Sequence, residues 1–372
     1  MTGRSTSFRI AAGAFAGLGL QVGVWAVLIP HVVASRGLTP AALGGALALM
    51  SATSIAALAA AGPVADRVGR RPLAVGGAAG FAVAFALLAG VESAAALWPT
   101  VALYGVASGC LDLAANAIGA DHERVHRERA MVRLHAGFSA AAAAGALAAG
   151  AAGPSMYWVA AALYGALALA LAVAPLPPHE EAAHPTGGRR ALLGVPAIVL
   201  ALAIVTLCFF GDGAIEGYAA LFLRDVLAAG SLATGAAFAA YHAASLTGRL
   251  LSSRVADERR LVAAAGLLAA AGMGVVVAAD SAALAAAGLL VVGFALAPIV
   301  PTALSLAARS APGRSATAVS LVTTVGYGAF VAGPPLVGAL AGLTSLRAAL
   351  APVVASAAAV AALALRGLGR ER

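Results

Sequence analysis

The sequence predicts an all-α membrane protein in which twelve transmembrane helices form two pseudo-symmetric six-helix bundles. Of the 372 residues, 62% are hydrophobic and only 10% are charged. Soluble domains contain about 25% charged residues, so this composition excludes an ordinary soluble fold. Lipid leaves only helices and closed barrels as spanning structures, and the long continuous apolar runs of this chain exclude a barrel.

Twelve apolar runs, each about as long as the 20 residues that a spanning helix needs, occupy most of the chain. They lie at residues 10–30, 42–63, 72–91, 96–119, 134–153, 156–175, 195–217, 231–251, 261–279, 281–305, 316–341 and 346–366. The first run follows two arginines but lacks a small-residue cleavage pattern, so we expect it to be retained as the first span. An even number of spans places both termini on one side.

The basic residues predict which side that is. All 23 are Arg, and 20 of them lie in the N-terminal segment, the even-numbered loops and the C-terminal tail, leaving Arg36, Arg224 and Arg347 on the other side. This asymmetry predicts cytoplasmic termini in the bacterial inner membrane. It also accounts for the net charge of +8, and without an aromatic-basic module we expect no nucleic-acid partner. Cys110 and Cys208 lie within spans and imply no disulfide framework.

One polar stretch divides the chain into two halves. The segment PLPPHEEAAHPTGGRR begins at Pro175 and is rich in Pro, Gly and charge, which favours a domain boundary. We therefore expect an N-terminal bundle at 1–175, a cytoplasmic linker at 176–194 and a C-terminal bundle at 195–372. An offset of 191 residues aligns Asp66 with Asp257 in the matching loop of the second half, which indicates an internal repeat.

The loop after the second span reads GPVADRVGRR from Gly62 to Arg71. It resembles the loop signature of the major facilitator superfamily of secondary transporters at every specified position. The resemblance implies a gating role for Asp257 and for Gly62, Asp66, Arg67, Gly69, Arg70 and Arg71. The alternative is a topology signal, which accounts for the arginines but not for the Gly and Asp spacing.

The fourth span contains GCLDLAANAIG, in which Asp112 and Asn116 share one helical face with Ser108. A charge in the bilayer costs several kcal/mol, so such a residue indicates function unless it is paired structurally. The run resembles the fourth helix of the fucose-permease branch of the superfamily, which implies that Asp112 and Asn116 contribute to a sugar and proton site. His135, at the start of the fifth span, is a candidate neighbour or a solvated surface residue.

The seventh span contains Asp212 and Glu216 at i and i+4 among three glycines, which favour a bend or an unwound turn. This stretch resembles the seventh helix of fucose-permease-like transporters and makes Asp212 the second candidate for coupling or substrate binding. Glu216 is expected to reach the outer interface. His242 lies near the middle of the eighth span, either as a neutral structural imidazole or in transport.

Gln21 and Trp25 in the first span and Tyr327 in the eleventh lie at a depth suited to lining a cavity, although aromatic residues also anchor spans at interfaces. Ala26 stands where fucose permeases carry a carboxylate. Proton coupling would therefore rest on Asp112, Asp212 or His242.

These features predict a monomeric secondary transporter that moves a small polar solute, such as a sugar, with protons by symport and alternating access. The alternatives are a drug or metabolite efflux antiporter, although the fifth span lacks a G-P-x-x-G-G element, and a membrane sensor without transport. We expect no enzyme, since neither a metal-ligand spacing nor a nucleophile elbow occurs, and no cofactor or metal.

Overall fold

The computed structural model describes residues 2–90, 93–127, 130–177, 192–252, 255, 257–311 and 314–367. The side chains of residues 2–4, 62–63, 65–68, 132 and 315–316 lie outside this description. Within the described ranges every regular element is a helix and none is a strand, which confirms the all-α prediction. Contacts divide the chain into a first unit, residues 1–182 with 230–239, and a second unit, residues 183–229 with 240–372.

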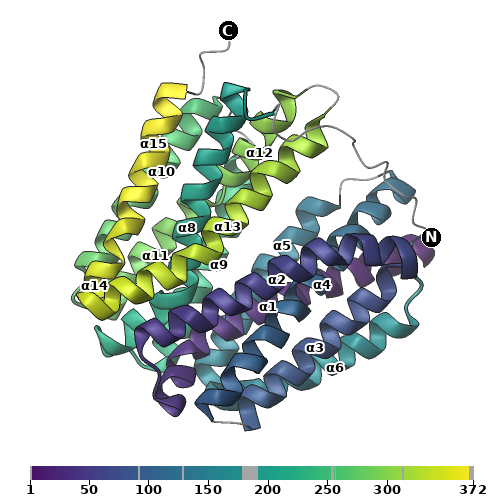
Figure 1. Cartoon of the computed structure of the whole chain (residues 1–372), viewed down its shortest axis with the longest axis horizontal. Helices are drawn as coiled ribbons and strands as arrows, with labels where there is room; N and C mark the ends of the chain where they lie inside the picture. The colour runs from purple at the N-terminus through teal and green to yellow at the C-terminus, as the bar shows by residue number, and fades with distance from the viewer. Residues whose placement is uncertain are drawn as a thin grey trace. The chain divides into compact units, whose positions relative to one another are not determined.

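The first unit is built from long helices joined by short connections (Figure 1). Its described helices are α1 (Thr2–Arg36), α2 (Pro40–Val68), α3 (Arg70–Gly90), α4 (Ala94–His126), α5 (Met131–Ala152), the short 3-10 turn η1 (Gly153–Ser155) and α6 (Met156–Val173). Helix α1 packs mainly against α5, α2 against α4, and α3 against both α4 and α6. An aromatic cluster of Phe81, Phe85, Tyr104 and Tyr164 fills the interior between α3, α4 and α6.

The second unit repeats this arrangement with more breaks. Its described helices are α8 (Pro196–Asp225), α9 (Ser231–Ser252), α10 (Glu258–Ala278), α11 (Ala282–Leu296), α12 (Ile299–Arg309), α13 (Ser315–Leu343), α14 (Leu346–Ala349) and α15 (Ala351–Gly367). The expected spans 281–305 and 346–366 are each split into two helices, at Pro298 and just before Pro352. Proline lacks a backbone N–H and its ring clashes with the preceding turn, so it interrupts a helix without ending the span.

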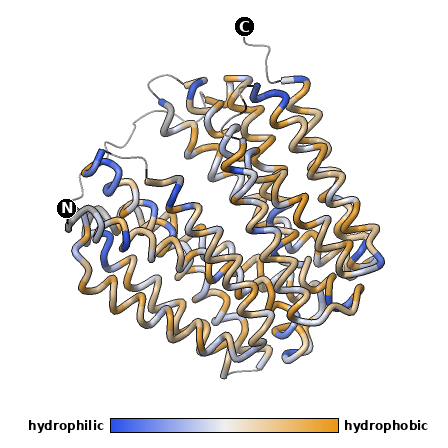
Figure 2. Tube along the Cα trace, turned by 180° about the vertical axis from the view of Figure 1, so that it is seen from behind, coloured by the Kyte–Doolittle hydropathy of each residue, from blue (hydrophilic) through white to orange (hydrophobic). Residues whose placement is uncertain are grey.

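The described helices account for all twelve predicted spans. Ten segments are long and apolar enough to cross a membrane, and one of them, residues 133–173, contains both α5 and α6. Helix α9 has 22 residues but is not among the ten, because its Ser, Thr, His and Arg side chains lower its hydropathy. With α5 and α6 counted separately and α9 added, the number is twelve. Figure 2 shows apolar residues along most of each helix and the hydrophilic segments mainly near helix ends.

Two glycines allow α1 and α5 to cross at very short distance. A Cβ added at Gly19 would overlap the carbonyl oxygen of Phe138, and one added at Gly23 would overlap that of Ala142. Small residues four apart are the usual means by which membrane helices bring their backbones together. The close contact between α1 and α5 therefore depends on these two positions.

Helix α9 contributes to both units along its length. Residues 230–239 group with the first unit, where a Cβ on Gly150 of α5 would lie 2.9 Å from the Cα of Gly235. The remainder of α9 groups with the second unit. The predicted boundaries at 175 and 195 stay a prediction, and residues 178–191 of the predicted linker lie outside the described part of the chain.

A single residue separates α2 from α3. Gly69 has a φ of +78°, a left-handed conformation that L-residues adopt at a cost, and it alone lies between Val68 and Arg70. Glycine is the usual residue where a helix ends this abruptly. Gly69 therefore allows the chain to turn between α2 and α3, and this role does not depend on whether the loop acts as a gate.

We expect Gly69→Ala to lower the free energy of unfolding by about 1–2 kcal/mol, because a side chain disfavours the left-handed conformation. Within the described part of the structure no atom beyond the chain neighbours lies within 4 Å of the added Cβ, so the expected cause is backbone strain. The measurement is thermal unfolding in detergent. Gly76→Ala on α3 is the matched control, since it also meets no atom within 4 Å and should be neutral or stabilising by up to about 1 kcal/mol.

Candidate functional site

Asp112 and Asn116 form a hydrogen-bonded pair on one face of α4. The Asn116 amide donates to the Asp112 Oδ1 atom at 3.0 Å and to the Asp112 carbonyl oxygen at 2.9 Å. Both side chains and Ser108 are partly exposed, whereas Leu111 and Ala115 beside them are fully buried. A carboxylate facing lipid would be costly, so this face of α4 is suited to a polar path within the protein.

Asp212 and Glu216 lie four residues apart on α8. Between residues 211 and 223 they are the only two side chains that are not buried. The Asp212 Oδ1 atom accepts a hydrogen bond of 3.0 Å from the hydroxyl of Tyr241 on α9. The helix continues unbroken past the three glycines, so the expected unwound turn is absent from α8.

None of these three carboxylates forms an ion pair with any residue that the structure describes. Arg249 of α9 is the described cation that acts on Asp212 electrostatically. An unpaired carboxylate within a span either takes up a proton or binds a cation, because burying the bare charge is too costly. These are the two chemistries that the arrangement supports.

The two histidine candidates have different surroundings. His242 is 5% exposed, and its Nε2 atom has no hydrogen-bond partner among the described residues. Its ring meets that of Tyr241 edge to face at 5.1 Å. His135 is exposed just after the first turn of α5, where its Nδ1 atom donates to the Met131 carbonyl at 2.9 Å and its ring lies 4.9 Å from that of Phe15.

Gln21 and Trp25 lie inside the first unit. The Tyr104 hydroxyl donates to the Gln21 side-chain oxygen at 2.6 Å, and the Trp25 ring lies 5.1 Å from that of Tyr104. Both residues are less than 10% exposed. Tyr327 differs, because it is partly exposed on α13 and stacks on Phe209 of α8 at 5.4 Å. Contact with solute stays a prediction for all three.

Arg70 of the loop after α2 lies in a buried polar cluster, the Arg70 cluster. Its guanidinium forms an ion pair with Asp121 of α4 and donates to the carbonyl oxygen of Pro177. Arg124 pairs with the same carboxylate at 2.8 Å. Arg70 is only 5% exposed and Asp121 6%. The cluster joins the start of α3 to the end of α4 and to the chain after α6.

Arg71 caps the carboxyl end of α6. It donates to the carbonyl oxygens of Leu171 at 3.1 Å and Ala174 at 2.7 Å. Arg259, in the first turn of α10, donates in the same way to Leu365 in the last turn of α15, at 2.6 Å. The last carbonyl groups of a helix lack partners within it and favour a nearby cation. The same kind of cap therefore occurs once in each half of the chain.

Asp257 is the N-cap of α10. Its carboxylate accepts from the Arg260 backbone N–H at 3.0 Å and pairs with the Arg260 side chain at 3.2 Å. An aspartate here satisfies one of the free N–H groups at the helix start. The side chains of Asp66 and Arg67 and the surroundings of Gly62 lie outside the described part, so their gating role stays a prediction.

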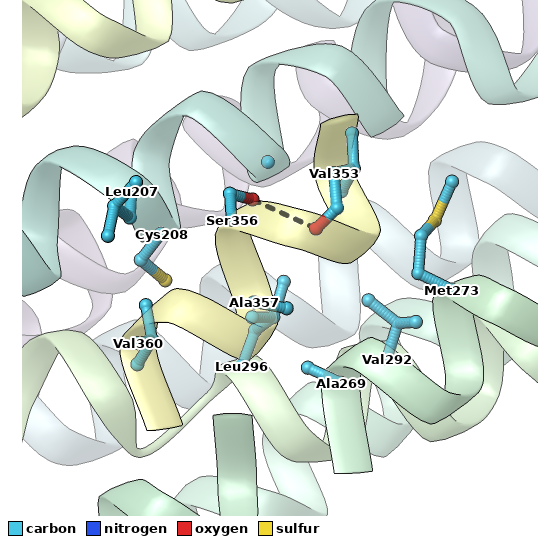
Figure 3. Close-up of a pocket in the computed structure, with 11 residues that line it drawn as sticks. Leu207, Cys208, Ala269, Met273, Val292, Leu296, Val353, Ser356, Ala357 and Val360 are labelled. Carbon is cyan, nitrogen blue, oxygen red and sulfur yellow. Dashed lines mark hydrogen bonds between the residues drawn. The ribbon is translucent and has the colours of Figure 1, made fainter. Parts of the chain in front are cut away.

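A small apolar void lies within the second unit (Figure 3). Its volume of about 10 Å³ is close to the least that one water molecule requires. Cys208 and Ser356 contribute its polar atoms, and the Ser356 hydroxyl already donates to the Val353 carbonyl at 2.9 Å. This void is too small for a solute.

Sequence reasoning missed three residues that the structure places beside the candidates: Tyr104, Asp121 and Tyr241. Asp121 could have been found as an acid near the end of the fourth span that might satisfy a motif arginine. Tyr241 directly precedes His242 and could have been noted as a donor at the depth of Asp212. Tyr104 gives no such signal, because aromatic residues are common in any apolar span.

Twelve spanning helices, some of which carry carboxylates, define a polytopic membrane protein. The chain belongs to the Major Facilitator Superfamily, whose profile matches residues 10–334. It is therefore a transporter and not an enzyme. Among curated proteins it is similar to the membrane protein MosC of Rhizobium meliloti, with 28% identity over 91% of this chain and 84% of MosC. It is also similar to an uncharacterised MFS-type transporter of Yersinia pestis, with 25% identity over 93% and 92% of the two chains.

Solved structures show the same twelve-helix, two-bundle fold. A point mutant of the nucleoside transporter NupG superposes with a TM-score of 0.81 at 12% identity, covering 97% of this chain and 99% of NupG. An inward-facing bacterial homologue of the lysosomal transporter Spinster gives 0.78 at 14% identity, covering 98% and 96%. At this identity the likeness establishes the fold alone.

Proposed function

We propose that this protein is a proton-coupled secondary transporter that carries a small polar solute across the bacterial inner membrane by alternating access. It works as a monomer. Both termini lie in the cytoplasm, which the distribution of arginines among the loops supports. The GCLDLAAN run of the fourth span and the acidic seventh span support a place in the fucose-permease-like branch. Ala26, in place of that branch's carboxylate, argues against fucose as the solute.

One observation carries the proposal: the only described side chain that forms a hydrogen bond with the Asp112 carboxylate is Asn116. An amide can donate to the ionised carboxylate and leave its second oxygen free to take up a proton. Since no described cation neutralises Asp112, a proton is the simplest means of lowering the cost of its burial. Loading and release of that proton then provide the step that couples solute movement to the proton gradient.

The test needs a solute, and a thermal-shift screen of purified protein against sugars, polyols, organic acids and common drugs would find one. A ligand that binds only the folded protein must raise its apparent stability. Proteoliposomes with an imposed proton gradient then measure uphill uptake of that solute.

We expect Asp112→Asn to abolish uphill uptake, because an amide cannot carry a proton. Internal solute should reach the external concentration and not exceed it, while exchange without a gradient continues. Asp225→Asn, the same change at an exposed ion pair with Arg224 at the end of α8, is the control and should accumulate solute normally. Wild-type accumulation by Asp112→Asn would overturn the assignment. Proton-driven loss of solute from loaded vesicles would favour the efflux antiporter instead.

A further inference from the structure

The carboxylates of Asp112 and Asp212 obtain their hydrogen bonds in different ways. Asn116, the partner of Asp112, lies one turn away on the same helix, so their contact moves with α4 as a unit. Tyr241, the partner of Asp212, lies on α9, 29 residues away in sequence. The second bond therefore exists only while α9 keeps its position beside α8.

The position of Tyr241 is set by close packing. Its side chain is 6% exposed. A Cβ added at Gly293 of α11 would overlap the Tyr241 carbonyl oxygen and lie 3.0 Å from the Cδ2 atom of the ring. Helix α9 is thus held against α11 at this residue, and the phenol has little freedom to leave Asp212.

The hydroxyl of Tyr241 is the only hydrogen-bond donor to the Asp212 carboxylate among the residues that the structure describes. The other groups near this stretch of α8 are Cys208 and Glu216 on the same helix, Arg249 on α9, the Phe330 carbonyl on α13 and the Ser356 hydroxyl on α15. Of these, Glu216 and Arg249 are the ionisable groups whose charge can act on Asp212, and neither donates a hydrogen bond to it.

We propose that Tyr241 is a positioning residue that sets the proton affinity of Asp212. A neutral phenol that donates to a carboxylate stabilises the ionised form over the protonated form. The role deepens the proposed proton coupling and rests on it, because it would tie the release of a proton from Asp212 to the position of α9.

The test is the pH dependence of modification by dicyclohexylcarbodiimide, followed by peptide mass spectrometry of purified protein in detergent. The reagent reacts with a protonated carboxyl group: the proton passes to a carbodiimide nitrogen while the carboxyl oxygen bonds to the central carbon. Fragmentation distinguishes an adduct on Asp212 from one on Glu216. Because no solute is needed, the result does not depend on whether transport is proton-coupled.

In Tyr241→Phe the midpoint of Asp212 modification should move to higher pH by about one unit, a tenfold gain in proton affinity. The ring and its packing against Gly293 remain, so a purely structural role would leave the midpoint in place. Tyr157→Phe removes a buried hydroxyl that donates to the Leu28 backbone at 3.4 Å, not to a carboxylate, and should leave the midpoint unchanged. Asp212→Asn should remove the adduct and so confirm its assignment.

An unchanged midpoint in Tyr241→Phe, or an equal shift in Tyr157→Phe, would overturn the role of Tyr241 whatever the transport assays show. The expected shift together with uptake that is independent of the proton gradient would overturn the proposed coupling and leave the role of Tyr241 standing. The two failures are therefore distinguishable.

Discussion

Replacing Arg70 with Ala should lower the free energy of unfolding by about 3–5 kcal/mol, the usual cost of removing one partner of a buried ion pair. Arg70 and Asp121 are both less than 10% exposed, so the substitution leaves an incompletely compensated carboxylate in the interior of the first unit. The Pro177 carbonyl loses its donor as well. The measurement is thermal unfolding in detergent with a thiol-reactive dye, because Cys208 is buried and Cys110 partly so.

Arg124→Ala is the matched control, since Arg124 pairs with the same carboxylate from a more exposed position. Exposed pairs contribute about 0.2–1 kcal/mol, so its melting temperature should change little. The double variant Arg70→Met with Asp121→Leu removes both charges and should recover most of the loss. Equal melting temperatures for Arg70→Ala and Arg124→Ala would show that the Arg70 cluster does not stabilise the first unit.

Gly23→Ala should destabilise the first unit by about 3 kcal/mol, at the upper end of the cost of overpacking. The added Cβ would overlap the Ala142 carbonyl oxygen and approach the Ala146 backbone nitrogen to 2.8 Å. Backbone atoms cannot rotate aside as a flexible side chain can, so α1 must shift away from α5. The drop in thermal stability should be visible by the same dye assay.

Gly13→Ala on the same helix is the control. Its Cβ meets only the end of the Leu167 side chain, at 3.8 Å, an ordinary contact distance. Removing a glycine from a helix interior is favourable by up to about 1 kcal/mol, so this variant should melt at or above the wild-type temperature. If the two variants melted alike, close approach of α1 and α5 at Gly23 would not be what holds them together.

The spans could be predicted from sequence because hydropathy acts locally. A run of about 20 apolar residues suits the bilayer whatever its neighbours are, and this holds for α2, α3 and α6 as it does for α10. Hydropathy did not show where a span is interrupted: two spans are each split into two helices, at Pro298 and before Pro352, where a missing N–H interrupts the backbone hydrogen bonds. Helix α8 continues through its three glycines without an unwound turn, since packing overrides a weak local preference.

The candidate site was predictable only in part. Asp112 and Asn116 were expected on one face because helical geometry alone brings residues four apart together. The gating role expected for Arg70 and Arg71 stays a prediction, and the motif itself did not predict their described contacts with Asp121, Pro177 and the end of α6. The spacing of residues within a motif does not indicate which distant helix those residues will contact.

The sequence by itself determined that the chain crosses the membrane, how many times it does so and which carboxylates lie inside the spans, because burial in lipid depends on each segment alone. Only the tertiary structure decided the partners of the polar side chains. These are Tyr241 for Asp212, Asp121 for Arg70, and the α6 carbonyls for Arg71. Such partners lie tens of residues apart in the chain. They meet only because helices pack closely, as where Gly293 of α11 lets the backbone of α9 approach at Tyr241.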